Sequence, residues 1–340
     1  MNMNKDIGID LGTATTLIHV RGQGLVLREP SVVALDTHTG KVLSVGEEAY
    51  RVLGKTPDRI RAIKPLADGV ISDYDVTAMM IKHFLKKVCK GSFLKPRVCV
   101  CVPSGVTEVE SRAVIDTCLA AGARKVYLME EPVAACLGAG IDIRKPGGVI
   151  VLDMGGGTSD IAVLSLSGIV CKTSIKVAGN RFNDAIVRYV RDRYNVLLGD
   201  NTAERTKIEI GTIWEDDPLK TCEVKGRNLM NGLPHRLELT NKELIAPLLA
   251  EAEQVATAVQ SVLERTPPEL VADIHERGLL MTGGGAMLGG LDKYLSARMG
   301  LKCYLAEDPV ECVARGVGMA FDYLDELVDG FINHTNHYQA

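Results

Sequence analysis

The amino-acid sequence predicts an α/β fold in which two similar domains each begin with a β-hairpin. In the segment 150–164 an apolar run ends at Asp153, three glycines follow, and a second apolar run leaves. A similar segment lies at 7–20, where Asp10 ends the first run and small residues make the turn. Elsewhere, helical apolar spacing alternates with short apolar runs. Two copies of one unit in a chain of 340 residues indicate a duplicated domain.

Both predicted hairpin tips have the chemistry of a site for a phosphate chain. The small residues of 12–14 and 155–157 leave backbone N–H groups that can approach an anion closely. The carboxylates of Asp10 and Asp153 can hold a divalent cation beside that anion. Hairpins that face each other would place the two acids on opposite sides of one polyphosphate with magnesium. For either segment alone, a tight turn that binds nothing is the alternative.

Each hairpin is expected to continue into a third apolar strand, at 30–35 and at 173–178. More polar segments follow each unit, at 36–75 and 212–240, and they mix turn residues with short apolar runs. This pattern is typical of small inserted subdomains. The sequence therefore predicts two larger domains, each with a smaller insertion.

The composition limits the classes of protein to which the chain can belong. A hydrophobic content of 46% and a charged content of 24% are ordinary for a globular protein. A net charge of −4 and 4% aromatic residues argue against a nucleic-acid partner, because binding would need a basic field or stacking platforms. Nine cysteines spread singly, without a CxxC pair, favour buried free thiols in a reducing compartment. Since the sequence shows no secretory leader and no run of 18 apolar residues, we expect a cytoplasmic chain.

Paired acids at the end of a predicted strand are candidates for catalysis. The strand 126–129 runs into Glu130, Glu131 and Pro132, and a helix is expected from Val133. Side chains between a strand end and a helix can meet a ligand at the edge of an α/β sheet. One carboxylate could orient or deprotonate a water that attacks a terminal phosphate. The alternative is two surface acids beside a helix N-terminus.

An apolar pair, Phe93 and Leu94, stands in a Gly/Ser/Pro loop after the predicted helix 75–89. Cationic residues surround the pair: Lys86, Lys87, Lys90, Lys95 and Arg97. An apolar tip with a cationic collar is the pattern of a loop that enters a membrane surface. Alternatively, both side chains fold back into the core.

The second half of the sequence predicts further helices and a third glycine turn. Helices are expected at 183–198, 202–209, 243–263 and 309–327, and a strand is expected at 302–305. The strand 279–281 runs into the glycines of 283–285, whose flat backbone suits an adenosine ring or ribose. The polar tail 331–340 is expected to be frayed.

An ordered set of motifs runs from residue 5 to about residue 328, at 7–14, 130–132, 153–158, 203–211, 266–270 and 282–286. This set resembles that of the MreB/Mbl family of bacterial actin homologues. Single motifs recur across the actin, heat-shock chaperone and sugar-kinase superfamily, but the ordered set with short insertions is specific to the MreB group. The resemblance implies an actin-like ATPase fold, with two RNase-H-like domains around a nucleotide cleft.

The resemblance also implies subdomain limits and site residues. The limits are 1–32, 66–148 and 313–340 for subdomain IA, 33–65 for IB, 149–181 and 243–312 for IIA, and 182–242 for IIB. ATP with Mg²⁺ is the implied ligand. Its phosphates would contact Gly12, Thr13, Ala14, Thr15, Gly155, Gly156, Gly157 and Thr158, and Asp10 and Asp153 would hold the metal. Its adenosine would lie against Glu204, Arg205, Lys207, Gly283, Gly284, Gly285 and Ala286. Glu131, with Glu130 beside it, would orient the water, and Phe93 and Leu94 would form the membrane-insertion loop.

Membership of such a family implies homopolymeric filaments, with paired protofilaments, on the inner face of the cell membrane. Those filaments would work with cell-wall elongation proteins to set rod shape. Thr15 stands where the family usually has Asn, and Asp160 stands where MreB often has Glu. Because no P-loop-type lysine follows the first hairpin, magnesium and backbone N–H groups are expected to neutralise most of the phosphate charge, and hydrolysis should be slow.

Two other functions remain open on the same fold. A sugar or acetate kinase would need a pocket for the phosphate acceptor and a general base near the γ-phosphate. A chaperone-type ATPase would need a substrate-binding domain after residue 330, where ten residues remain.

Overall fold

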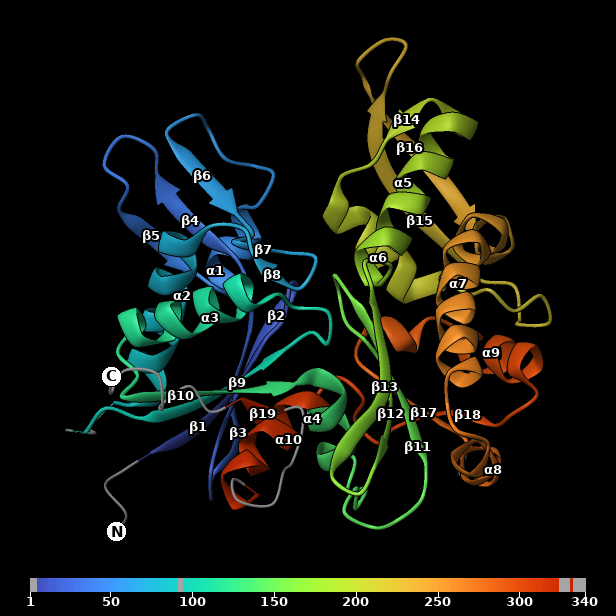
Figure 1. Cartoon of the computed structure of the whole chain (residues 1–340). Helices are drawn as coiled ribbons and strands as arrows, with labels where there is room; N and C mark the ends of the chain where they lie inside the picture. The colour runs from blue at the N-terminus through green and yellow to red at the C-terminus, as the bar shows by residue number, and fades with distance from the viewer. Residues whose placement is uncertain (1–4, 91–93, 324–330, 333–340) are drawn as a thin grey trace.

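The computed structural model describes residues 5–90, 94–323 and 331–332, and two large β-sheets dominate it (Figure 1). The first sheet has the strand order β19-β10-β9-β1-β2-β3. Its strands are β1 (Asp6–Leu11), β2 (Thr15–Val20), β3 (Gly24–Pro30), β9 (Arg97–Val102), β10 (Lys125–Glu130) and β19 (Phe331–Ile332). Strands β1, β9 and β10 are parallel, and the other pairings are antiparallel.

The second sheet repeats this arrangement with the order β13-β12-β11-β17-β18. Its strands are β11 (Val149–Met154), β12 (Ser159–Ser165), β13 (Gly168–Ile175), β17 (Leu279–Thr282) and β18 (Cys303–Leu305). In both sheets an antiparallel three-strand unit is extended by a parallel strand beside its first member. The predicted duplication of a hairpin-led α/β domain is therefore confirmed.

The third strand of each unit begins earlier than predicted. Gly22 and Gly24 have φ of 77° and 80°, so the chain turns at once and β3 ends at Pro30. Leu166 and Ser167 make the equivalent turn before β13, with φ of 50° and 62°. The apolar run predicted as a third strand at 30–35 instead enters β4 (Val33–Asp36), a strand of a smaller sheet.

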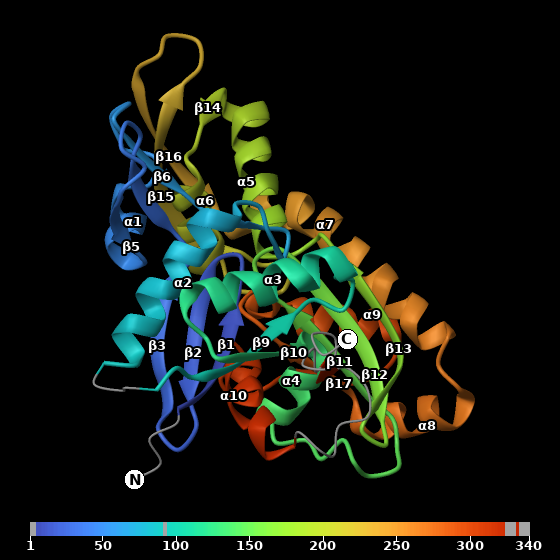
Figure 2. The ribbon, with the colours of Figure 1, turned by 60° about the vertical axis from the view of Figure 1, so that its left-hand side comes forward.

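Helices cover both faces of each large sheet (Figure 2). In the first sheet, α2 (Tyr74–Val88) and α3 (Glu108–Ala121) pack on one face. Helices α4 (Glu131–Gly138) and α10 (Cys312–Met319) pack on the other. Strand β9 alternates between these two cores, because Val98 and Val100 face α2 and α3 whereas Cys99 and Cys101 face α4 and α10.

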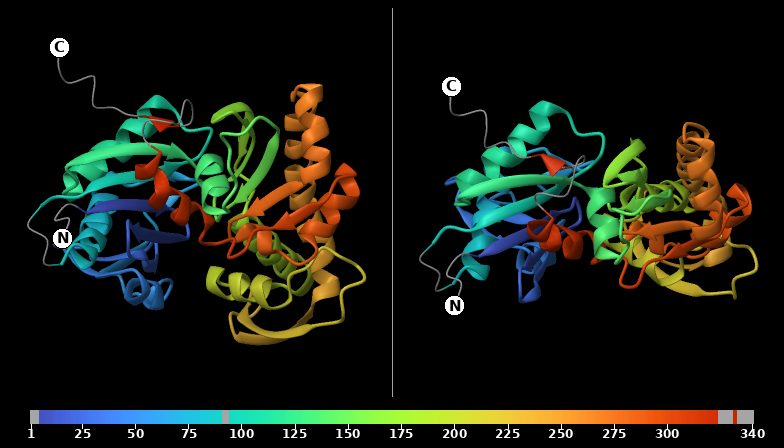
Figure 3. Two further views of the ribbon diagram at one scale, coloured as in Figure 1. Left: turned by 90° about the horizontal axis from the view of Figure 1, so that it is seen from below. Right: turned by 60° about the horizontal axis from the view of Figure 1, so that its bottom comes forward.

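Helices α4 and α10 also join the two halves of the molecule. Val151 and Leu280 of the second sheet belong to the same apolar cluster as α4 and α10. The opposite face of that sheet packs on α5 (Gly179–Tyr194), α7 (Asn241–Glu264), α8 (Pro268–Arg277) and α9 (Leu291–Met299). Figure 3 shows the two halves side by side, with the short α10 between them. A single shared layer thus fixes one sheet relative to the other.

Each half carries a smaller sheet (Figure 1). Strands β4, β5 (Val42–Val45) and β6 (Ile60–Ile63) form one, beside α1 (Glu47–Val52). Strands β14 (Val196–Leu197), β15 (Thr221–Asn228) and β16 (Pro234–Thr240) form the other, beside α6 (Asp200–Ile210). A two-stranded hairpin, β7 (Leu66–Ala67) and β8 (Val70–Ile71), follows the first small sheet. The exact subdomain limits stay a prediction.

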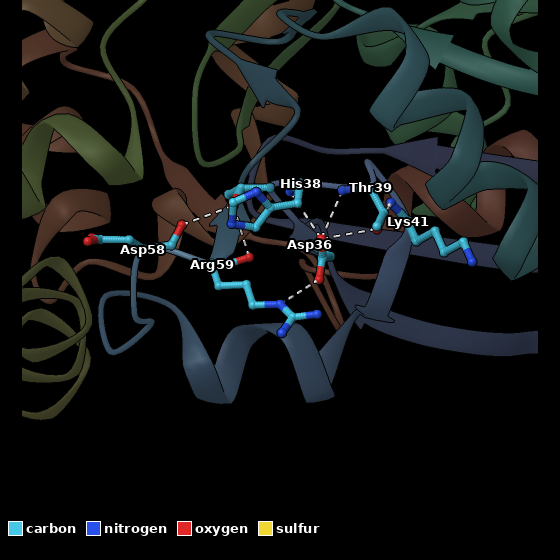
Figure 4. A network of polar contacts seen from close by, with 7 residues as sticks. Asp36, His38, Thr39, Lys41, Asp58 and Arg59 are labelled. Atoms are coloured by element: carbon cyan, nitrogen blue, oxygen red, sulfur yellow. Dashed lines mark hydrogen bonds and ion pairs between the residues drawn. The ribbon is translucent and has the colours of Figure 1, made fainter.

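A buried carboxylate orders the first small sheet (Figure 4). Asp36 accepts the backbone N–H groups of His38 and Thr39 at 3.0 and 2.9 Å, and Arg59 donates to its second oxygen at 3.1 Å. These contacts, the Thr39 N–H first among them, hold the pKa of Asp36 below its usual value. The network fixes the β4–β5 turn and the start of β6.

Several predicted element ends need correction. Helix α5 begins at Gly179 and stops at Tyr194, because Asn195 takes the left-handed conformation with φ of 51°. Gly199 caps α6, so Thr202 lies inside that helix. Two 3₁₀ turns, η1 (Gly285–Met287) and η2 (Ala320–Asp322), follow β17 and α10. Residues 331–332, predicted as part of a frayed tail, pair with β10.

Within the described ranges, no helix has the length and apolarity to span a membrane. The nine cysteines are free thiols, and seven of them are buried, as predicted.

Candidate functional site

A cleft of about 460 Å³ opens between the two halves and collects most of the predicted site residues. The lining residues that were predicted are Asp10, Gly12, Thr13, Ala14, Thr15, Glu131, Asp153, Gly155, Gly156, Gly157, Thr158, Glu204, Lys207, Gly283, Gly284 and Gly285. They come from both hairpin tips, the start of α4, helix α6 and the turn after β17. Both halves of the duplication therefore form one site.

The two hairpin tips meet at the cleft floor. A Cβ on Gly157 would lie 2.6 Å from Thr13 Oγ1, and one on Gly156 would lie 3.0 Å from the Cβ of Ala14. The Thr13 hydroxyl also accepts the backbone N–H of Gly69 at 3.0 Å. Only glycine lets the second tip approach the first so closely, so these glycines serve the close approach as well as the turn.

Asp10 and Asp153 end the first strands of their hairpins and lie on either side of the cleft. Asp153 is 4% exposed and accepts the Thr282 hydroxyl at 2.6 Å, while Cys101 lies 3.4 Å from Asp10. Burial raises the pKa of Asp10 to about 6 and that of Asp153 to about 7. Asp10 adds to the shift at Asp153, because two nearby negative charges disfavour each other. A bound cation would relieve that repulsion.

The donor set fits magnesium better than a metal held by protein alone. Among residues 5–90, 94–323 and 331–332, no group of three or more metal-ligating side chains occurs. Mg²⁺ is usually bound by one or two carboxylates together with phosphates and waters. Asp10 and Asp153, which lie beside the backbone N–H groups of the two hairpin tips, match this mode of Mg²⁺ binding.

Of the two predicted catalytic acids, Glu131 alone lines the cleft. Burial raises its pKa well above the usual value, and the carboxylates of Asp160, Asp153 and Asp10 raise it further. Glu130 is buried outside the cleft lining, and Lys172 of β13 pairs with it at 2.6 Å. Glu130 ends the strand β10 and Glu131 begins α4, so the two neighbouring side chains have different surroundings.

Helix α6 presents one face to the cleft. Glu204 and Lys207 share that face at a spacing of three residues, whereas Arg205 points away and reaches the Glu223 carbonyl. Lys207 donates to the Gly179 carbonyl at 2.9 Å, and burial lowers its pKa to about 8. Tyr50 of α1 donates to Glu204 at 3.2 Å, so a hydrogen bond joins the two small subdomains across the cleft mouth.

Four further predicted residues lie outside the cleft lining or outside the described part of the chain. Arg205 and Ala286 do not line the cleft, and Ala286 is instead buried in the core. Phe93 lies outside the described residues. Leu94, its neighbour, is 44% exposed.

The structure adds lining residues that the sequence reasoning missed. They are Leu11, Leu17, Arg28, Gly69, Gly179, Asn180, Ile208, Gly211, Met287, Leu288, Val310 and Val313. Ile208 and Gly211 continue the helix that carries Glu204, so helical spacing could have found them. Arg28 and Val310 come from segments that only the tertiary fold brings to the cleft.

Comparison with known proteins decides the family. A sequence model for "MreB/Mbl protein" matches residues 4–329. The chain belongs to the MreB/Mbl family.

Named MreB/Mbl proteins are similar to the chain over almost its whole length. It is 48% identical over 324 residues to the cell shape-determining protein Mbl of Bacillus subtilis, with coverage of 95% of this chain and 97% of that protein. It is 47% identical over 328 residues to the cell shape-determining protein MreB of Escherichia coli K12, with coverage of 95% and 94%. The predicted family is therefore confirmed.

Crystal structures of MreB5 of Spiroplasma citri, one bound to ADP and one to AMPPNP, superpose with a TM-score of 0.90 at 37% identity. They cover 94–95% of this chain and 97–98% of MreB5. The predicted actin-like ATPase fold of this MreB/Mbl chain is confirmed.

The raised pKa values predict that the empty cleft loses stability as pH rises. Above about pH 4 the unfolded chain loses these protons, whereas the folded chain keeps them on Asp10 up to about pH 6 and on Asp153 up to about pH 7, so the free energy of unfolding falls over this range. The slope is up to about 1.4 kcal/mol per pH unit for each retained proton. Asp153→Asn should make the slope shallower. Urea unfolding in EDTA at a series of pH values measures it.

The matched control is Asp192→Asn, which changes an exposed acid of α5 that lies outside the cleft. It should leave the slope as in the wild type. A wild-type stability that does not change over this pH range would contradict the assigned electrostatics of the cleft.

Proposed function

We propose that this chain is an ATP-binding, actin-like cytoskeletal protein. It assembles into membrane-associated filaments of paired protofilaments, hydrolyses ATP slowly, and directs cell-wall synthesis and rod shape together with cell-wall elongation proteins. The observation that carries this proposal is the pair of acid-ended hairpins whose tips meet at one cleft. The nucleotides named for the MreB5 structures support ATP as the ligand. Family membership favours this function over a small-molecule kinase.

In this mechanism the two tips bind the phosphate chain from both sides. Backbone N–H groups near Gly12 and Gly156 donate to phosphate oxygens, and the Thr13 and Thr158 hydroxyls flank them. Asp10 and Asp153 would hold Mg²⁺, which neutralises charge on the phosphates when bound.

Glu131 is the candidate for the hydrolytic step. Its carboxyl group orients the attacking water and takes a proton from it as the water adds to the terminal phosphate. The neighbouring acids that raise its pKa make it a stronger base, but they also favour its neutral form.

The adenosine end lies between α6 and the turn after β17. Glu204 accepts ribose hydroxyl groups, and the bare backbone of Gly283, Gly284 and Gly285 allows close stacking. The Tyr50–Glu204 hydrogen bond joins α1 to α6 beside this end of the cleft.

Sedimentation tests the function as a whole. The purified chain should pellet as filaments with Mg-ATP and stay in the supernatant without nucleotide. Filaments should be visible by electron microscopy on lipid. If ATP binds but no polymer forms, and a phosphate acceptor among a panel of sugars and acetate is phosphorylated, the kinase alternative replaces this proposal.

Glu131→Ala should leave ATP bound and slow phosphate release by about 10²-fold, because the water loses its general base. Release of phosphate and binding of a fluorescent ATP analogue measure the two effects separately. The matched control is Glu130→Ala, which removes an adjacent acid that pairs with Lys172 outside the cleft. An unaltered release rate in Glu131→Ala would rule out Glu131 as the base.

Membrane association is proposed to rest on Phe93 and Leu94. Phe93→Ser with Leu94→Ser should reduce co-flotation with anionic liposomes, because the apolar tip is lost while the cationic residues around it remain. The matched control is Leu229→Ser with Met230→Ser, which changes another exposed apolar pair, at 44% and 81% exposure. Unchanged flotation of the Phe93/Leu94 variant would remove the loop from the membrane contact.

A further inference from the structure

Arg28 reaches the cleft from the edge strand of the first sheet. It lies in β3 directly across from Leu17 of β2, and both residues line the cleft. Directly opposed residues of an antiparallel pair have their side chains on the same face of the sheet. Leu17 follows the first hairpin tip closely, so Arg28 is held near the proposed phosphate site by strand register.

Acidic side chains outnumber cationic ones among the charged residues that line the cleft. The described lining residues include four acids, Asp10, Glu131, Asp153 and Glu204, and two cations, Arg28 and Lys207. Lys207 already donates to the Gly179 carbonyl on the α6 side. On the side of the first sheet, Arg28 is the cationic lining residue in the described part of the chain.

The present partner of Arg28 is weak. Its guanidinium lies 3.9 Å from a carboxylate oxygen of Glu311, which is beyond hydrogen-bond distance. The Arg28 side chain is 57% exposed and that of Glu311 is 34% exposed. An exposed ion pair of this kind contributes little to stability, so exchange of Glu311 for a better anion costs little.

The second unit has a position equivalent to that of Arg28, and the two can be compared through strand register. Strand register makes Leu17 the partner of Asp10 in the first hairpin and Asp160 the partner of Asp153 in the second. Arg28 is then across from Leu17 as Ser174 is across from Asp160. Equivalent positions of the two units thus hold a cation in one half and a hydroxyl beside a buried acid in the other.

We propose that Arg28 is a phosphate-binding residue, which releases Glu311 and donates to the phosphate chain of the bound nucleotide. This inference rests on the proposed nucleotide function. A guanidinium keeps its charge at all relevant pH values and can donate two parallel N–H groups to phosphate oxygens. Arg28 would therefore supply, from the neighbouring strand β3, the cation that no lysine after the first hairpin provides.

Calorimetric titration of the full chain with Mg-ADP, AMP and adenosine tests the proposal. Arg28→Ala should weaken Mg-ADP binding about tenfold, equal to about 1.4 kcal/mol, and should change adenosine binding little. Arg28→Lys should bind Mg-ADP with an intermediate affinity, because lysine keeps the positive charge but cannot donate two parallel N–H groups. Glu311→Gln should strengthen Mg-ADP binding slightly, because it removes the competing anion.

The matched control is Arg112→Ala on α3, an exposed arginine 3.8 Å from an acid and absent from the cleft lining. It should bind all ligands as the wild type does. Wild-type affinity for Mg-ADP in Arg28→Ala, or equal losses for ADP and adenosine, would overturn the phosphate assignment. No nucleotide binding by the wild-type chain would instead overturn the proposed function, and this inference with it.

Discussion

The close crossing of α4 and α10 is the contact on which the cleft depends. A Cβ on Gly138 would lie 1.8 Å from the carbonyl oxygen of Cys312, and one on Gly316 would lie 1.8 Å from that of Ala134. Both helices pack against the first sheet, and α4 also packs against the second. Because two glycines let the backbones touch, the two sheets share one thin layer, and their hairpin tips can meet on the far side of it.

This geometry brings like charges together as well as hairpins. Asp10, Asp153, Asp160 and Glu131 lie close to one another, and burial shifts the pKa of each toward its neutral form. Packing thus holds the acids in place at an electrostatic cost that a cation with a polyphosphate would lower. Polar contacts between the two halves, such as the Ser104 N–H that donates to Asp160 at 2.6 Å, connect this charge state to the relative position of the halves.

Features that local sequence pattern determines were predictable, whereas features that long-range strand register determines were not. Strand, turn and strand are adjacent in the sequence, so both hairpins and their terminal acids were predictable. Helical spacing alone also separates Glu204 and Lys207 from Arg205.

The choice of Glu131 over Glu130 came from the family resemblance, and the surroundings of the two acids agree with it. The third strand of the second unit was misplaced because the turn at Leu166 and Ser167, which are not glycine, has no clear sequence signal. Arg28 escaped prediction because its place depends on a bulge between Ile18 and His19 that shifts the β2–β3 register.

Different residues at equivalent register positions make the two halves of the cleft unequal. Had both units kept identical residues at equivalent positions, each side would present the same charge to a ligand, and a phosphate chain could bind in either direction. Instead Arg28 lies across from Leu17 in the first unit, while Ser174 lies across from Asp160 in the second, and Asp160 contacts Glu131. A phosphate chain gains most when its strongly bound part faces the guanidinium and its reacting end faces the acids, where a cation and a water are needed. Divergence at one pair of register positions thus adds to the asymmetry of a duplicated fold which, in the proposed function, binds its nucleotide in a single direction.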